Sequence, residues 1–160
     1  MCIRDRLKVV SPPPSVPLQA TAVRFGDLAN LVGVAVETPA IAVHPGDALT
    51  VTLAYDVLAP SSVDLTRFVH FYDPALGMAA QADGLPQQGL NPTWSWVPGE
   101  RVVDQVVLSV APDAAPGRYR LVTGFYAANR NGERLAVFGA NDEPLPDNLA
   151  PLMEIELHAR

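Results

Sequence analysis

Short segments of alternating apolar and polar residues, separated by turns, make up most of the chain. The clearest segment is 48–58, whose two sides differ sharply in polarity. One side carries Leu49, Val51, Leu53, Tyr55 and Val57, and the other carries Thr50, Thr52, Ala54 and Asp56. Because successive side chains point to opposite faces of a strand, this pattern predicts a half-buried β-strand.

Other segments predict further strands and the turns between them. Residues 23–36 indicate a strand pair or a bent strand, and strands are also expected at 65–72, 78–83, 101–110, 117–127, 134–138 and 152–158. No segment sustains a 3.6-residue period, so little or no helix is expected. Pro-Gly pairs at 45–46, 98–99 and 116–117 each precede a strand and favour type II turns.

A late turn helps to choose the fold class. Asp113, Gly117 and Tyr119 have the arrangement of a tyrosine corner, in which a tyrosine at the start of a late strand bonds to upstream backbone and pins the crossover between two sheets. With the short strands, this predicts an all-β fold, an immunoglobulin- or fibronectin-III-like antiparallel β-sandwich of seven to eight strands.

The N-terminal part of the chain differs from the rest. Residues 1–6, MCIRDR, resemble the translation of a transposon-end sequencing adapter, so we expect 1–6 to be an artefact and the true N-terminus to lie upstream. Residues 7–19 include SPPPSVP and are expected to form a Pro-rich linker, extended like polyproline at about 3 Å per residue. The alternative is a rigid arm lying on the domain. Residues 20–160 are expected to be the β-sandwich domain.

Composition and charge exclude several classes of function. The chain is 49% apolar and 18% charged, as expected for a globular domain. Its net charge of −6, without a Lys/Arg cluster, argues against nucleic acid and anionic membrane surfaces as partners. No apolar run is long enough for a bilayer span. The single cysteine, Cys2, lies in the adapter-like segment and says nothing about the redox compartment.

Three stretches together resemble a known family. They are VHPGDALTVTLAYDVLAP, FVHFYDPALGMAAQADGLP and NPTWSWVPGERVVDQVVLSVAPDAAPGRYRLVTGFYAANRNGERL. In this order, over residues 20–157, they resemble the C-terminal extracytoplasmic β-sandwich domain of bacterial multi-pass membrane glycosyltransferases of the dolichyl-phosphate-mannose-mannosyltransferase-like type. The resemblance implies that the catalytic acidic residues lie in a membrane portion upstream. The chain departs from the family pattern at Tyr55 and Trp94, where Trp and a small hydroxyl residue are usual.

Two tryptophans one residue apart are the first candidate site. On an extended backbone, Trp94 and Trp96 would point to the same side and could form a platform that stacks on sugar rings, or they could be core. Trp96 matches the family pattern before a turn, which favours a structural role. Trp94 is the additional ring and the better candidate for ligand contact.

The segment RFVHFYD supplies two more possible ligand contacts, His70 and Tyr72. His70 is either a hydrogen-bonded, partly buried side chain or a ligand contact, because both faces of its strand are apolar. Metal ligation is not expected, since His44 and His158 are remote in sequence. The acidic residues are interpreted as solvated loop carboxylates, with calcium ligation as the alternative; they are Asp73, Asp83, Asp104, Asp142, Glu143 and Asp147.

No motif indicates catalysis or a cofactor. The chain has no nucleophile elbow, phosphate loop, zinc-protease motif or Cys pair. We therefore expect a non-catalytic accessory module of a truncated membrane glycosyltransferase, outside the cytoplasmic membrane, with a glycan or the membrane domain as its partner. The alternatives are a carbohydrate- or protein-binding domain of a secreted or cell-surface protein, and a structural spacer.

Overall fold

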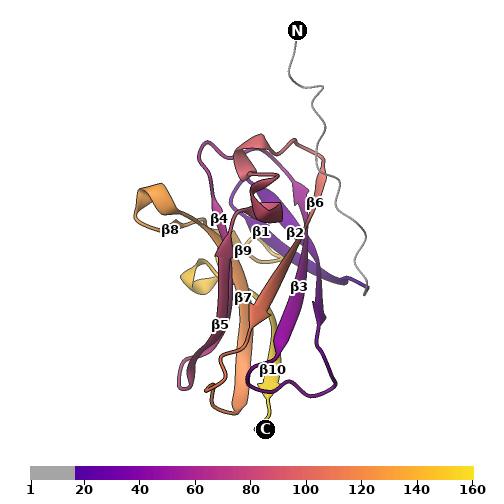
Figure 1. The fold of residues 1–160 in the computed structure, drawn as a ribbon. Helices are drawn as coiled ribbons and strands as arrows, with labels where there is room; N and C mark the ends of the chain where they lie inside the picture. Colours follow the sequence, from indigo (N-terminus) through magenta and orange to yellow (C-terminus); the bar gives the residue numbers. More distant parts are fainter. Residues whose placement is uncertain (1–16) are drawn as a thin grey trace.

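The computed structural model describes residues 17–160, and these form a β-sandwich of two antiparallel sheets (Figure 1). Eight strands have seven or more residues and two have only two residues. The only helical segments in this part of the chain are short 3₁₀ turns. The predicted all-β antiparallel sandwich is confirmed. The predicted boundary between residues 6 and 7 lies outside the described residues, and the first strand begins at Gln19.

The strands are divided between two sheets. They are β1 (Gln19–Phe25), β2 (Ala29–Glu37), β3 (Ala48–Val57), β4 (Thr66–Asp73), β5 (Gly77–Gly84), β6 (Arg101–Ser109), β7 (Gly117–Ala127), β8 (Glu133–Arg134), β9 (Val137–Phe138) and β10 (Ala150–Leu157). One sheet has the order β6-β3-β2-β1-β9; the other has the order β10-β7-β4-β5, with β8 paired to β7. The 3₁₀ turns are η2 (Pro86–Gly89), η3 (Thr93–Ser95), η4 (Ala128–Arg130) and η5 (Pro146–Asn148).

The strand at 48–57 is more buried than its alternating pattern predicts. Leu49, Tyr55 and their neighbours on the same side face the core, but Thr52 and Ala54 on the opposite side are also buried. Leu18 accounts for part of this: it packs over Gly33, the ladder partner of Ala54. The prediction of a half-buried strand is therefore wrong for the middle of β3, and Leu18 covers part of the outer face of its sheet.

Two of the three Pro-Gly turns form as predicted. Gly46 and Gly99 have φ of 89° and 88°, and the amide at the end of each turn donates to the carbonyl at its start, at 3.1 Å in 44–47 and 3.0 Å in 97–100. The third prediction is wrong: Gly117 belongs to β7, and the turn before it is closed by Ala114 N donating to Ala111 O (3.1 Å). The predicted tyrosine corner is confirmed, because the Tyr119 hydroxyl donates to Ala115 O (2.6 Å).

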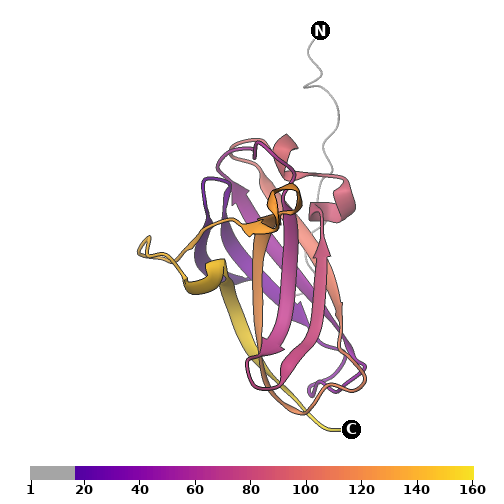
Figure 2. The ribbon, with the colours of Figure 1, turned by 90° about the vertical axis from the view of Figure 1, so that its left-hand side faces the viewer.

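The single strand predicted at 134–138 is also wrong. The segment forms β8 and β9, which belong to different sheets: Arg134 pairs with Tyr126 of β7, whereas Val137 pairs with Phe25 of β1. The chain crosses from one sheet to the other at this point. The loop before β8 consequently projects from one end of the sandwich, beside the outer face of the β10-β7-β4-β5 sheet (Figures 1 and 2).

Candidate functional site

The two tryptophans do not share a face. Residues 93–95 form the 3₁₀ turn η3 rather than extended backbone, so the side chains separate. Trp96 is 2% exposed, its ring lies 5.6 Å from that of Tyr55, and its Nε1 donates to Asn91 O (2.8 Å). Trp94 is 49% exposed. Trp96 is therefore part of the core, and only Trp94 offers an aromatic surface to a ligand.

His70 and Tyr72 lie together on the outer face of the β10-β7-β4-β5 sheet, the side turned toward the viewer in Figure 2. In β4, Val69 and Phe71 are fully buried in the core. His70, between these two, and Tyr72, after Phe71, point outward and are only partly exposed. The structure thus brings two of the four predicted contact residues to one face, and leaves Trp94 on a different element.

Phe68 is the centre of a group of side chains on this face. The His70 ring is 4.7 Å from the Phe68 ring, the Tyr126 ring is 6.1 Å from it, and the Arg134 guanidinium carbon lies over it at 5.0 Å. Beneath it is Gly124, where an added Cβ would approach Phe68 Cζ to 2.6 Å. We call Phe68, His70, Asp83, Tyr126 and Arg134 the β4 face cluster.

Asp83 is the polar partner of the two partly exposed rings in this cluster. The Tyr126 hydroxyl donates to Asp83 Oδ2 (2.9 Å), and His70 Nε2 lies 3.9 Å from Asp83 Oδ1. The pKa of His70 is lowered mainly by burial, against the opposing effect of Asp83, and Arg134 lowers it further. Burial, followed by Asp83, raises the pKa of Tyr126. Both rings are therefore neutral at pH 7, next to a carboxylate that is one-third exposed.

Arg134 holds the hydrophobic centre of the face against the neighbouring loop. Its Nη1 donates to Asp147 O in η5 (3.0 Å) while its guanidinium stacks on Phe68. The cluster therefore offers aromatic edges, a carboxylate acceptor and a guanidinium donor within one small area. Such a set suits a ligand with both C–H surfaces and hydroxyl groups.

Sequence reasoning did not find Tyr126 and Arg134, and it interpreted Asp83 as a solvated loop carboxylate, with calcium ligation as the alternative. The signal that identifies Asp83 is strand register: Phe68 pairs with Asp83 on one side and with Gly124 on the other. Alternation within one strand does not contain that information, because it gives the face of a residue but not its neighbours across the sheet.

The other acidic candidates for calcium do not converge within residues 17–160, and most of them already have hydrogen-bond or ion-pair partners. Asp73 accepts from the amides of its own turn, Asp104 pairs with Arg67 inside the sandwich, and Asp142 pairs with Arg24. Within residues 17–160 no group of three or more His, Cys, Asp or Glu side chains converges. In the same range no helix has the length and apolarity needed to cross a membrane.

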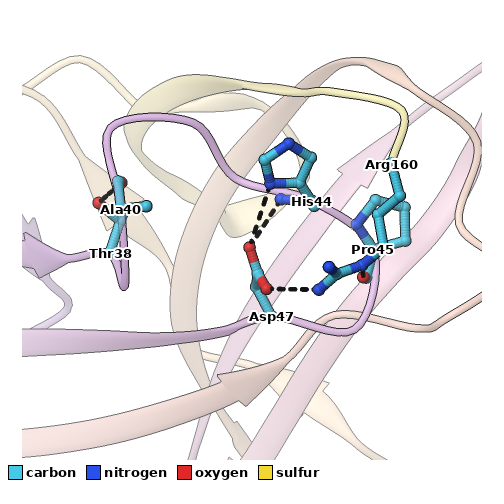
Figure 3. Close-up of polar contacts among 6 residues, drawn as sticks. All are labelled: Thr38, Ala40, His44, Pro45, Asp47 and Arg160. Atoms are coloured by element: carbon cyan, nitrogen blue, oxygen red, sulfur yellow. Dashed lines mark hydrogen bonds and ion pairs between the residues drawn. The ribbon is translucent and has the colours of Figure 1, made fainter.

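A second polar group, at the C-terminal end of the sandwich, has a structural role (Figure 3). Asp47 Oδ2 accepts from the His44 amide (2.9 Å), and Asp47 Oδ1 accepts from Arg160 Nη2 (2.9 Å). Arg160 Nε also donates to Pro45 O (2.8 Å). The two bonds of Arg160 fasten it to the turn at 44–47, while the second carboxylate oxygen of Asp47 stabilises the turn itself.

Comparison with known proteins identifies the fold but no family. No protein-family model matches the sequence, and no curated protein matches it. The structure is similar to the crystal structure of the C-terminal domain of wzt, with a TM-score of 0.55 and 13% identity over 88% of this chain and 78% of that one. A crystal structure of the ApaA protein from Bordetella pertussis aligns over 89% of this chain and 98% of its own, with 15% identity and a TM-score of 0.36, which is too low to indicate a common fold.

Proposed function

We propose that this chain is a non-catalytic binding module that holds a glycan on the outer face of its β10-β7-β4-β5 sheet. The observation that supports this proposal is the β4 face cluster, in which the partly exposed rings of His70 and Tyr126 lie on either side of the buried Phe68 ring and both approach Asp83. A sugar ring presents C–H groups on its faces and hydroxyls at its edge. The rings of His70 and Tyr126 provide apolar contact, and Asp83 accepts from hydroxyls.

The arrangement is suited to binding rather than to bond cleavage. A glycosidase needs two carboxyl groups flanking the bond to be cleaved. Within residues 17–160 Asp83 is the one carboxylate for which a contact with these rings is found, and its partner His70 is held neutral by burial. The ligand would therefore be retained and positioned without being changed.

The wider context of the module is proposed from the motif order of the sequence. It would be the C-terminal extracytoplasmic part of a truncated membrane glycosyltransferase, presenting acceptor glycan to the transferase or bracing its membrane domain. The alternative is a carbohydrate- or protein-binding domain of a secreted or cell-surface protein. Sequencing of the locus across codon 7, from a library made without transposon adapters, separates them: upstream membrane helices favour the first, and a signal peptide or further sandwiches favour the second.

Calorimetric titration with a panel of neutral and acidic oligosaccharides tests the glycan-binding proposal. Asp83→Asn is expected to weaken binding about 10- to 100-fold, because a hydrogen bond to a charged group contributes about 1.5–3 kcal/mol. Glu156→Gln is the matched control, since Glu156 is an exposed carboxylate near the far end of β10. Trp94→Ala tests the other exposed ring, and unchanged affinity removes Trp94 from the site. Equal affinity of the Asp83→Asn and Glu156→Gln variants would contradict the proposal.

A further inference from the structure

A pocket of about 250 Å³ lies at one end of the sandwich, apart from the centre of the β4 face cluster. Three segments enclose it: the turn between β1 and β2, the loop between β3 and β4, and the hairpin that runs from β7 into β8. Its floor is apolar and includes the buried side chains of Leu28, Leu65 and Ala127. Among the side chains of the β4 face cluster, only Arg134 lines this pocket as well.

Hydrogen bonds fix two walls of the pocket, the turn between β1 and β2 and the loop between β3 and β4, to each other and to the core. The amides of Leu58 and Ala59 both donate to Leu28 O, at 2.8 and 3.2 Å. The hydroxyl of Thr93, which is fully buried, lies 2.7 Å from Ser61 Oγ and accepts from the Leu65 amide (3.1 Å). The loop between β3 and β4 is thus held from both ends, and the pocket exists before any ligand enters.

The hairpin wall is fixed in the same way. Gly26 N donates to Ala136 O (2.8 Å), which ties the β1–β2 turn to the segment after β8. Gly132 N donates to Ala127 O (3.1 Å) and closes the hairpin itself. A ligand therefore meets three walls whose backbone is already ordered, and little conformational entropy is lost on binding.

The charged side chains of the pocket balance one another. Two carboxylates and two guanidiniums line it, namely Asp27, Glu133, Arg130 and Arg134. Within residues 17–160 the side chains of Asp27, Arg130 and Glu133 form no hydrogen bond or ion pair, so their polar atoms are available to a ligand. Because the formal charges cancel, neither an anion nor a cation is favoured over a neutral molecule.

The shape and chemistry together define the ligand class. We infer that this pocket is a second binding site, for a neutral, hydroxyl-rich ring of the size of one pyranose. Its volume lies just below the roughly 300–1,000 Å³ of pockets for drug-sized ligands, which suits a single ring. The apolar floor covers one face of the ring. Carboxylates accept from its hydroxyls, and Arg130 donates to its oxygens.

Amide chemical shifts of the ¹⁵N-labelled chain test this inference. Methyl α-mannopyranoside and methyl β-glucopyranoside serve as probes at up to about 10 mM, which would nearly saturate a site with a Kd of about 1 mM. Saturable shifts are expected at amides of the three walls, such as Ser62 and Leu135. Arg130→Ala and Glu133→Gln are each expected to weaken binding about tenfold. Arg118→Ala and Glu156→Gln, at the opposite end of the sandwich, are matched controls and should leave the shifts unchanged.

Three results would overturn the inference: no saturable shift at the walls, equal binding by the pocket variants and the controls, or tighter binding of methyl glucuronide than of the neutral glycosides. The same experiment tests the pocket inference and the proposed function separately. If oligosaccharides shift only amides of β4, β5 and β7, the pocket inference is wrong and the proposed function stands. If only the wall amides shift, the pocket is supported and the proposed face is wrong.

Discussion

Replacing Asp104 by asparagine should strongly destabilise the sandwich, because it leaves a buried guanidinium without a counter-charge. Arg67 of β4 and Asp104 of β6 face each other between the two sheets, with side chains 7% and 1% exposed. Arg67 Nε donates to Asp104 Oδ2 (2.8 Å), and Asp104 Oδ1 accepts from the Gln87 amide (2.9 Å). Asparagine keeps the volume and one acceptor but removes the charge.

The expected cost follows from the burial of the pair. Breaking a buried ion pair by removing one partner costs about 3–5 kcal/mol. For a chain of 160 residues, where 1 kcal/mol corresponds to about 2–4 °C, this lowers Tm by roughly 6–20 °C. Urea denaturation followed by circular dichroism measures the free energy of unfolding directly.

A matched surface pair makes this prediction refutable. Arg101 and Asp56 are 58% and 44% exposed and are joined at 2.7 Å, so Asp56→Asn should cost only about 0–1 kcal/mol. The double variant Arg67→Met with Asp104→Leu should recover most of the lost stability, because apolar side chains can replace a buried ion pair. If Asp104→Asn costs no more than Asp56→Asn, the buried pair does not have the role assigned to it.

Three further predictions concern the core and the face. Trp96→Ala should lower the free energy of unfolding by about 3–5 kcal/mol and Trp94→Ala by about 0.5 kcal/mol or less, since only the Trp96 ring is buried. Similar losses of stability for the two variants in urea denaturation would contradict this prediction. Gly124→Ala should cost about 1–3 kcal/mol by overpacking Phe68, and an unchanged Tm would show that the ring moves freely. The buried Tyr55 hydroxyl lies near Thr123 without a hydrogen bond of normal geometry in the described chain, and burial raises its pKa, so Tyr55→Phe should be neutral or stabilising at pH 7. Above pH 10 the Tyr55 hydroxyl loses its proton in the unfolded state but keeps it in the folded state, so this group lowers the free energy of unfolding by about 1.4 kcal/mol per pH unit. In urea denaturation at alkaline pH, Tyr55→Phe should therefore lose stability less steeply with pH than the parent chain. Equal slopes would refute the raised pKa of Tyr55.

The strands could be predicted from the sequence because their alternation and turn signals are local. The strand predicted at 101–110 shows this well: β6 covers Arg101–Ser109, and its residues alternate between buried and more exposed positions. The segment 134–138 could not be resolved, because its division into β8 and β9 depends on which strand each part pairs with. Pairing partners are a property of the whole fold and leave no mark on so short a segment.

The same distinction explains the outcome for the candidate site. His70 and Tyr72 were found by residue type, within one segment rich in aromatic residues. Asp83 and Tyr126 join His70 only through the register of three neighbouring strands. The prediction of a joint tryptophan surface depended on an extended backbone at 94–96, and the turn η3 removes that condition.

Mapping a bound oligosaccharide by amide chemical shifts tests the central claim most directly. The measurement uses the ¹⁵N-labelled chain with the oligosaccharide that binds most tightly in calorimetry. A glycan held on the outer face should shift amides around His70, Asp83 and Tyr126, and Asp83→Asn should abolish these shifts at the same concentration. Shifts confined to the turn that carries Trp94, or no saturable shift with any oligosaccharide of the panel, would contradict the claim.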